Sequence, residues 1–221
     1  MPLWERAAEL QALDRALTHA RDGHGCVALV TGEAGIGKTA LIEHFVARVS
    51  NTASILRGSC EALFAPRPLG PLHDVVHALK GELLAALERG TNPVDLFHGL
   101  LDALREADRP TILVIEDVHW ADHGTLDFIK FLARRVGPVP ALLVLSYRDN
   151  EVGADHPLAN VIGEIPADQR LHVPLPLLSR STVESVARDA GRAGDELYRI
   201  TQGHPLFVTE LLLSDGDRVA P

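Results

Sequence analysis

Residues 27–41, with the sequence VALVTGEAGIGKTAL, decide the fold. The apolar residues 27–30 predict a buried parallel strand, and a helical pattern begins at about Lys38. Between them lies the sequence GEAGIGKT, residues 32–39, which is a complete G-x-x-x-x-G-K-[ST] phosphate loop. The loop therefore stands in the strand–loop–helix context that this motif requires.

The chemistry of this loop follows from its residue types. Glycines allow positive φ angles and a close approach of the backbone to an oxyanion, so successive N–H groups form an anion-binding nest. The helix that follows adds unpaired N–H donors and the positive end of its dipole. We expect Lys38 to reach the β- and γ-phosphates and the Thr39 hydroxyl to bind Mg²⁺. The expected nucleotide contacts are Gly32, Glu33, Ala34, Gly35, Ile36, Gly37, Lys38, Thr39 and Ala40.

Composition narrows the class of protein. The chain has 221 residues, of which 46% are hydrophobic, so it can bury a sizeable core. A formal net charge of -9 argues against direct nucleic-acid binding, which needs clustered Lys and Arg. Two cysteines form no disulfide framework, and no signal peptide or membrane-length apolar run is present. We expect a cytoplasmic protein that does not contact a membrane.

Two acids end a second apolar run, TILVIED, at residues 111–117. A phosphate-loop ATPase needs one carboxylate beside Mg²⁺ and usually another that polarises the attacking water. Because consecutive strand residues point to opposite faces, we assign Glu116 to Mg²⁺, through water, and Asp117 to the attacking water. The alternative is a strand that ends in two solvated acids.

A cation follows a third apolar run, PALLVLSY, at residues 140–147. Arg148 could approach the γ-phosphate from the end of this strand and stabilise transition-state charge. The alternative, which the spacing leaves equally open, is a surface arginine paired with Asp149 or Glu151.

The order of elements predicts the fold class. Five strands are expected near residues 27–30, 54–57, 111–117, 140–147 and 170–175, mostly separated by helices. This pattern indicates a three-layer α/β domain over residues 1–178 with a five-stranded parallel sheet. Residues 179–221 read as a small helical appendage, in which Ser181 and Glu184 form a capping-box pattern. Its corner Gly203-His204-Pro205 could be helix punctuation only.

Together these stretches resemble a known family. TGEAGIGKT, IEDVHWAD, LSYRDNE and TQGHPLFVTELL are similar to the nucleotide-binding domain of STAND-class ATPases (signal transduction ATPases with numerous domains), as in large LuxR-type, MalT-like transcriptional regulators. The resemblance implies an AAA+-like phosphate-loop NTPase fold with strand order 5-1-4-3-2. It also implies that ADP holds an inactive form and ATP a signalling form.

The resemblance assigns further roles. It makes Arg148 the sensor of the γ-phosphate, brings Pro205 to the adenine and lines the base with the segment around Glu5-Arg6. It implies that the chain ends about where a winged helix would begin. The sequence departs from the family where it has Trp4-Glu5-Arg6 in place of Gly-Arg-Glu, His204 in place of Asn, and Glu116 in place of Asp.

The function expected from these features is an ATP-binding, slowly hydrolysing switch domain that uses ATP or ADP with Mg²⁺. It would act as a weak ATPase with a regulatory role, and protein partners or self-association are expected in a full-length regulator. One alternative is a phosphotransferase with an acceptor pocket in residues 58–71. Another is a nucleotide-stabilised interaction scaffold without turnover.

Overall fold

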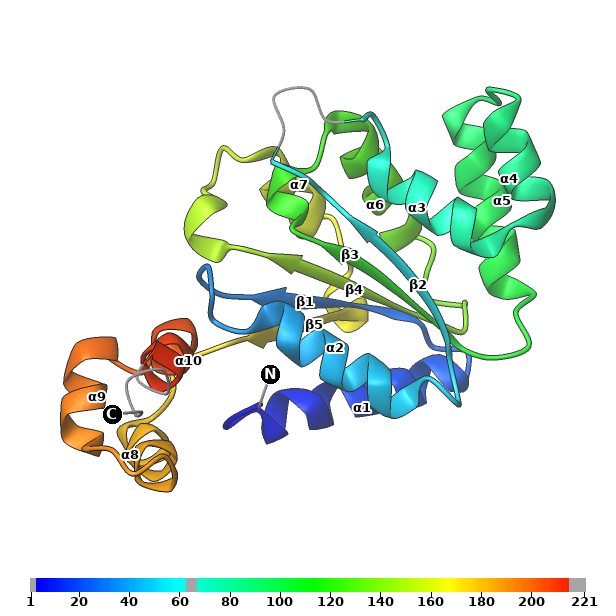
Figure 1. The fold of residues 1–221 in the computed structure, drawn as a ribbon. Coiled ribbons are helices and arrows are strands. Elements are labelled where there is room, and N and C mark those ends of the chain that lie inside the picture. Colours follow the sequence, from blue (N-terminus) through cyan, green and yellow to red (C-terminus); the bar gives the residue numbers. More distant parts are fainter. Residues whose placement is uncertain (1–2, 63–66, 215–221) are drawn as a thin grey trace.

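Five strands form one parallel sheet in the computed structural model, which describes residues 3–62 and 67–214 (Figure 1). Their order is β2-β3-β4-β1-β5, which is the predicted order 5-1-4-3-2 seen from the other edge. The predicted fold class, a three-layer phosphate-loop α/β fold, is confirmed. The strands are β1 (Cys26–Thr31), β2 (Ser54–Ser59), β3 (Thr111–Glu116), β4 (Ala141–Tyr147) and β5 (Arg170–Pro174).

The interior of the sheet comes from the most apolar runs. Every residue of β4 is buried, as are the first five of β3, because helices cover both faces of a parallel sheet. All carboxyl ends meet at one edge, where Thr31 lies beside Tyr147 and Ser59 lies beside Glu116. The phosphate loop and the acids therefore share that edge.

Helices cover the two faces of the sheet (Figure 1). Ala28 and Val30 of β1 belong to the core beneath α1 and α2, whereas Val27 and Leu29 belong to the core beneath α3, α5, α6 and α7. This alternation is the period-two pattern of a strand buried on both sides. The helices are α1 (Ala7–Arg21), α2 (Lys38–Val49), α3 (Gly70–Leu79), α4 (Gly81–Glu88), α5 (Pro93–Arg105), α6 (His123–Ala133) and α7 (Pro157–Gly163).

The sequence predicts one helical stretch near residues 72–88, weakened at Gly81, and the structure has two separate helices there. Lys80 and Gly81 both have positive φ, 61° and 68°, so the chain turns between α3 and α4. The prolines and the glycine near the end of residues 58–71 predict an irregular stretch there, and the structure shortens it, because β2 runs to Ser59 and α3 begins at Gly70. Its residues 63–66 lie outside the described part of the chain.

The appendage packs three helices around its own small core beyond the carboxyl edge of the sheet (Figure 1). They are α8 (Arg180–Asp189), α9 (Gly194–Thr201) and α10 (Pro205–Ser214). The predicted cap at Ser181 is wrong: Ser179 is the N-cap, and its Oγ accepts a hydrogen bond from the Thr182 N–H at 3.2 Å. Across residues 3–62 and 67–214, no helix combines the length and the apolar character needed to cross a membrane.

Candidate functional site

The phosphate loop joins β1 to α2 at the carboxyl edge of the sheet. Three of its residues, Gly32, Gly35 and Gly37, have φ angles of 141°, 75° and 101°, which side-chain-bearing residues rarely adopt. A Cβ built at Gly37 would meet no atom within 4 Å, so the loop opens into free space at the start of α2. These residues fit the cradle that a phosphate chain requires.

Lys38 is the buried cation of this loop. Its side chain folds back so that Nζ donates to the carbonyl oxygens of Gly32, at 2.7 Å, and Glu33, at 2.9 Å. Burial lowers the pKa of Lys38, and the nearby charge of Asp117 partly offsets that effect. Within the described ranges no carboxylate forms an ion pair with Lys38, and its direct partners are these two loop carbonyls.

The two residues predicted to hold Mg²⁺ touch each other. Thr39 begins α2, Glu116 ends β3, and the Thr39 hydroxyl donates to Glu116 Oε2 at 2.7 Å. A hydroxyl and a carboxylate at one point supply hard oxygen ligands, which Mg²⁺ prefers in combination with phosphate and water. The pair therefore fits the ion, and the role itself stays a prediction.

Asp117 does not belong to the strand. The prediction that Glu116 and Asp117 face opposite sides as consecutive strand residues therefore does not apply. β3 ends at Glu116, and Asp117 has the left-handed angles φ 55° and ψ 41° before the short 3-10 helix η1 (Val118–Trp120). Its N–H donates to Ser146 Oγ of β4 at 3.1 Å, which helps hold this unusual turn. Such conformations cost about 1–3 kcal/mol and concentrate at functional sites. Because the chain turns at Asp117, the alternation of a strand does not extend from Glu116 to Asp117.

Arg148 forms an ion pair with Glu151, as in the alternative of a surface arginine paired with a neighbouring acid. Its Nη1 donates to Glu151 Oε1 at 2.6 Å, within the 3-10 turn η2 (Asp149–Glu151) that follows β4. Its guanidinium also lies 4.9 Å from the ring centroid of Trp120, in cation–π geometry. Sequence reasoning assigned Trp120 no role, although the motif DVHWAD already contained it.

His119 lies next to Trp120 and Glu151. Its ring is buried, its Nε2 lies 3.6 Å from Glu151 Oε2, and neither ring nitrogen has a hydrogen-bond partner within the described part of the chain. Burial lowers the pKa of His119, while Asp117 and Glu151 act in the opposite direction. The neutral ring is therefore favoured beneath Trp120, whose ring centroid lies 4.5 Å away.

The appendage reaches the phosphate loop through its Gly-His-Pro corner. His204 Nε2 lies 2.9 Å from the carbonyl oxygen of Ala34, and because a carbonyl only accepts, Nε2 carries the proton. A Cβ at Gly35 would stand 2.9 Å from side-chain atoms of both His204 and Leu206, and the φ of 75° at Gly35 also favours glycine. The corner lies between α9 and α10 and makes a direct contact with the loop.

The residues expected near an adenine also lie together. Pro205, Ile36, Ala40 and Trp4 line one small cavity of about 20 Å³, little more than the roughly 10–15 Å³ that one water needs. A purine base at this position therefore requires the appendage or the N-terminal segment to shift.

The N-terminal segment is tied to both sides of this cavity. Arg6 is only 3% exposed and donates to the carbonyl oxygens of Pro176, at 2.6 Å, and Ile36, at 3.4 Å. The Glu5 carboxylate accepts from the Ser179 N–H at 2.8 Å, which lowers the pKa of Glu5. The segment thus links the loop to the start of the appendage.

Comparison with known proteins identifies related domains. Residues 2–145 match the family model of the AAA ATPase domain. An uncharacterized protein of Rhizobium meliloti (strain 1021) is 25% identical over 272 residues, a match that covers 100% of this chain and 26% of that protein. This chain therefore spans about a quarter of that relative's length.

Solved structures share the fold. The ORC2 protein of Aeropyrum pernix, in its ADPNP-ADP complexes, has a TM-score of 0.64 at 18% identity, covering 97% of this chain and 63% of that one. A STAND protein with a tetratricopeptide repeat sensor from Pyrococcus horikoshii has a TM-score of 0.54 at 22% identity, covering 90% and 29%. The RuvB Holliday junction branch migration motor of Thermotoga maritima has a TM-score of 0.56 at 14% identity, covering 96% and 62%. At these identities the likeness establishes the fold.

Proposed function

This chain belongs to the AAA ATPase domain family, and on that premise we propose that it is an ATP-binding, slowly hydrolysing switch domain of a STAND-type signalling regulator. The observation that carries the proposal is the hydrogen bond from His204 of the appendage to Ala34 of the phosphate loop. Through this contact, a change in the conformation of the phosphate loop would be passed to the appendage, which has its own small core. The likeness to a STAND protein supports this class, and the DVHWAD stretch, which resembles the LuxR-type regulators, supports a role in transcription regulation.

The residues of the phosphate loop and the two acids would each have a separate role in binding and hydrolysis. Lys38 would exchange its two carbonyl partners for phosphate oxygens, and the loop N–H groups would hold the remaining charge. Thr39 and Glu116 would hold Mg²⁺, which supplies charge neutralisation on the β- and γ-phosphates. Asp117, beside the buried Lys38, would accept the proton of the attacking water.

Arg148 would report the γ-phosphate by changing partners. A guanidinium can bind either a carboxylate or a phosphate, and Arg148 is held by a single contact from its Nη1 to Glu151 Oε1, so a γ-phosphate would compete with Glu151 for Arg148. In the proposed switch, ATP draws Arg148 away from Glu151 and ADP leaves the pair intact. The presence of the γ-phosphate thus decides which of two ion pairs Arg148 forms at the end of β4.

Nucleotide binding and turnover test this proposal. Calorimetry should show Mg·ATP affinity reduced about tenfold or more in Lys38→Ala, since a hydrogen bond to a charged group contributes roughly 1.5–3 kcal/mol. Lys130→Ala is the control, because that half-exposed lysine of α6 pairs with Glu164 and does not belong to the phosphate loop. Unchanged affinity in Lys38→Ala would reject the site.

Hydrolysis is tested separately with Asp117→Asn. This variant should bind Mg·ATP as the wild type does and hydrolyse it about a hundredfold more slowly, a typical contribution of general-base catalysis. Wild-type turnover in the variant contradicts the role of Asp117. Binding without any turnover in the wild type favours the scaffold alternative.

A phosphotransferase remains the second candidate because one feature favours it. A cavity of about 190 Å³ lies at the carboxyl edge between β2 and α3, where an acceptor pocket was expected, and Cys60, Asp74 and Trp120 line it. Asp122 also lines this cavity, but its carboxylate accepts hydrogen bonds from the N–H and the hydroxyl of Thr125 and is therefore already engaged within the fold. ATP consumption that depends on an added small acceptor would favour this reaction over hydrolysis.

A further inference from the structure

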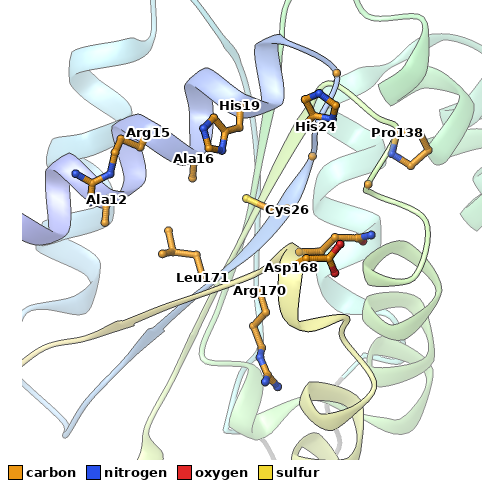
Figure 2. A pocket seen from close by; sticks show the side chains of 14 residues that line it. Ala12, Arg15, Ala16, His19, His24, Cys26, Pro138, Asp168, Arg170 and Leu171 are labelled. Atoms are coloured by element: carbon orange, nitrogen blue, oxygen red, sulfur yellow. The ribbon is translucent and has the colours of Figure 1, made fainter.

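A larger cavity lies at the opposite edge of the sheet, where the strands begin. Its volume is about 750 Å³, and it opens between α1, the turn that joins α1 to β1, and the start of β5 (Figure 2). Small-molecule sites commonly measure about 300–1,000 Å³. The cavity has the size of an organic ligand and shares no lining residue with the phosphate loop.

The middle of the cavity is apolar. Ala16 of α1 is buried, and Cys26 of β1 and Leu171 of β5 are half-buried at the cavity wall. Figure 2 shows Ala16 on the helix side, with Cys26 and Leu171 facing it from the two strands. This apolar strip of Ala16, Cys26 and Leu171 is where a ring or chain would lose contact with water.

The rim carries polar side chains that the fold does not use. Arg15, His19, His24 and Asp168 line the cavity, and none of these side chains makes a hydrogen bond or ion pair within residues 3–62 and 67–214. Gln169 also lines it, and its Oε1 is buried without a partner. Each of these groups keeps its full capacity to bind a ligand.

Arg170 serves as a contrast. Its Nη1 donates to the Ile162 carbonyl oxygen at 3.1 Å, and in Figure 2 its guanidinium points away from α1. The cation that faces the cavity is therefore Arg15, and the opposing acid is Asp168. Figure 2 places them at opposite ends of the apolar strip, and they form no ion pair with each other.

We propose that this cavity binds a small dipolar organic molecule. Its anionic group meets Arg15, its apolar body covers the strip of Ala16, Cys26 and Leu171, and its ammonium or other donor group meets Asp168. A ligand with only one of these charges leaves the other end of the cavity unmatched. The site is separate from the nucleotide site, and its occupation does not depend on the proposed switch.

Three matched probes test the charge pattern. They are an aminomethyl biphenyl carboxylate, its methyl ester, which lacks the anion, and the corresponding methyl biphenyl carboxylate, which lacks the ammonium. Calorimetry uses the whole chain with saturating Mg·ADP, so that the probes do not occupy the phosphate loop. The dipolar probe should bind about two- to fivefold tighter than either partner, since an exposed ion pair contributes roughly 0.2–1 kcal/mol. Equal affinity of all three probes would overturn the proposal.

Single substitutions locate each charge. Arg15→Ala should remove the advantage of the dipolar probe over its ester, and Asp168→Asn should remove its advantage over the carboxylate that lacks the ammonium. Arg21→Ala is the control: this exposed arginine lies on the same helix, donates to Thr52, and does not line the cavity. Both advantages should survive in the control, and their survival in the two test variants contradicts the assignment.

Cys26 reports the position of the probe without any substitution. Burial raises the pKa of its thiol to about 11, so thiolate is scarce near neutral pH and labelling is slow. Methyl methanethiosulfonate, which modifies thiols and leaves the amine of the probe intact, is therefore used at about pH 8, where the probe keeps its ammonium charge, and the Cys26 peptide is followed by mass spectrometry over hours. Saturation with the dipolar probe should slow this labelling. Unchanged labelling of Cys26 at saturation places the probe elsewhere and overturns the proposal.

Discussion

Single residues carry the chemistry of the site, and Arg148 is the one whose surroundings matter most. Its spacing after β4 left two readings equally open, and the structure has the ion pair with Glu151. Trp120 lies against the same guanidinium in cation–π geometry. The ion pair thus supplies the resting partner that a γ-phosphate sensor needs.

Glu151→Gln tests whether that ion pair competes with the γ-phosphate. Removal of the competing charge should strengthen ATP binding about two- to fivefold and leave ADP binding unchanged, as expected for an exposed ion pair. Arg148→Ala should remove the preference for ATP over ADP. Fluorescence titration with both nucleotides measures the ratio, and an unchanged ratio in both variants contradicts the role of Arg148.

Glu116→Gln tests the Mg²⁺ site. An amide keeps the size of the side chain and its hydrogen bond from Thr39 but loses the charge that attracts the ion. The gain in ATP affinity on adding Mg²⁺ should fall about tenfold, whereas affinity measured in excess chelator should stay the same. An equal loss with and without Mg²⁺ would place Glu116 outside the metal site.

Secondary-structure elements were predicted well where their own sequence determines them. The apolar runs of β1, β3 and β4 predicted the interior of the sheet, because burial on both faces requires such residues. The turn at Asp117 and the break between Lys80 and Gly81 were not predicted. These two features depend on contacts and φ angles that an apolar pattern does not contain.

Ser179→Ala tests the corrected start of α8. Loss of an N-cap side chain costs about 1 kcal/mol, so urea unfolding should show that reduction in the stability of the appendage. Ser181→Ala is the comparison variant: Ser181 lies inside the first turn, its exposed hydroxyl contacts Ser179 Oγ at 2.9 Å, and its loss should change stability by less than about 0.5 kcal/mol. A larger loss of stability in Ser181→Ala than in Ser179→Ala would show that Ser181 is the N-cap after all.

The contact between Glu5 and Ser179 predicts a dependence on pH. The pKa of Glu5 is lowered in the folded chain, so its contribution to stability is present above the ordinary carboxyl pKa and is lost as pH falls through the folded value. The melting temperature of the wild type should therefore exceed that of Glu5→Gln near neutral pH. The difference should shrink in acid, and a difference independent of pH contradicts this ionic contribution.

The whole molecule joins a sheet domain to a helical appendage through few contacts. The sequence predicted both parts and the loop between β1 and α2, but it did not predict that His204 would touch Ala34. That contact joins residues 170 positions apart in the chain, and no local pattern encodes it. It is also the contact on which the proposed switch depends.

Amide hydrogen exchange in the presence of Mg·ATP and of Mg·ADP tests the switch most directly. Exchange in α10 and in the phosphate loop should change together between the two nucleotides, because in the proposed switch His204 couples the two elements. Lys38→Ala should abolish the change. Identical exchange in α10 with both nucleotides, at saturation of each, would contradict the claim that this domain is a nucleotide switch.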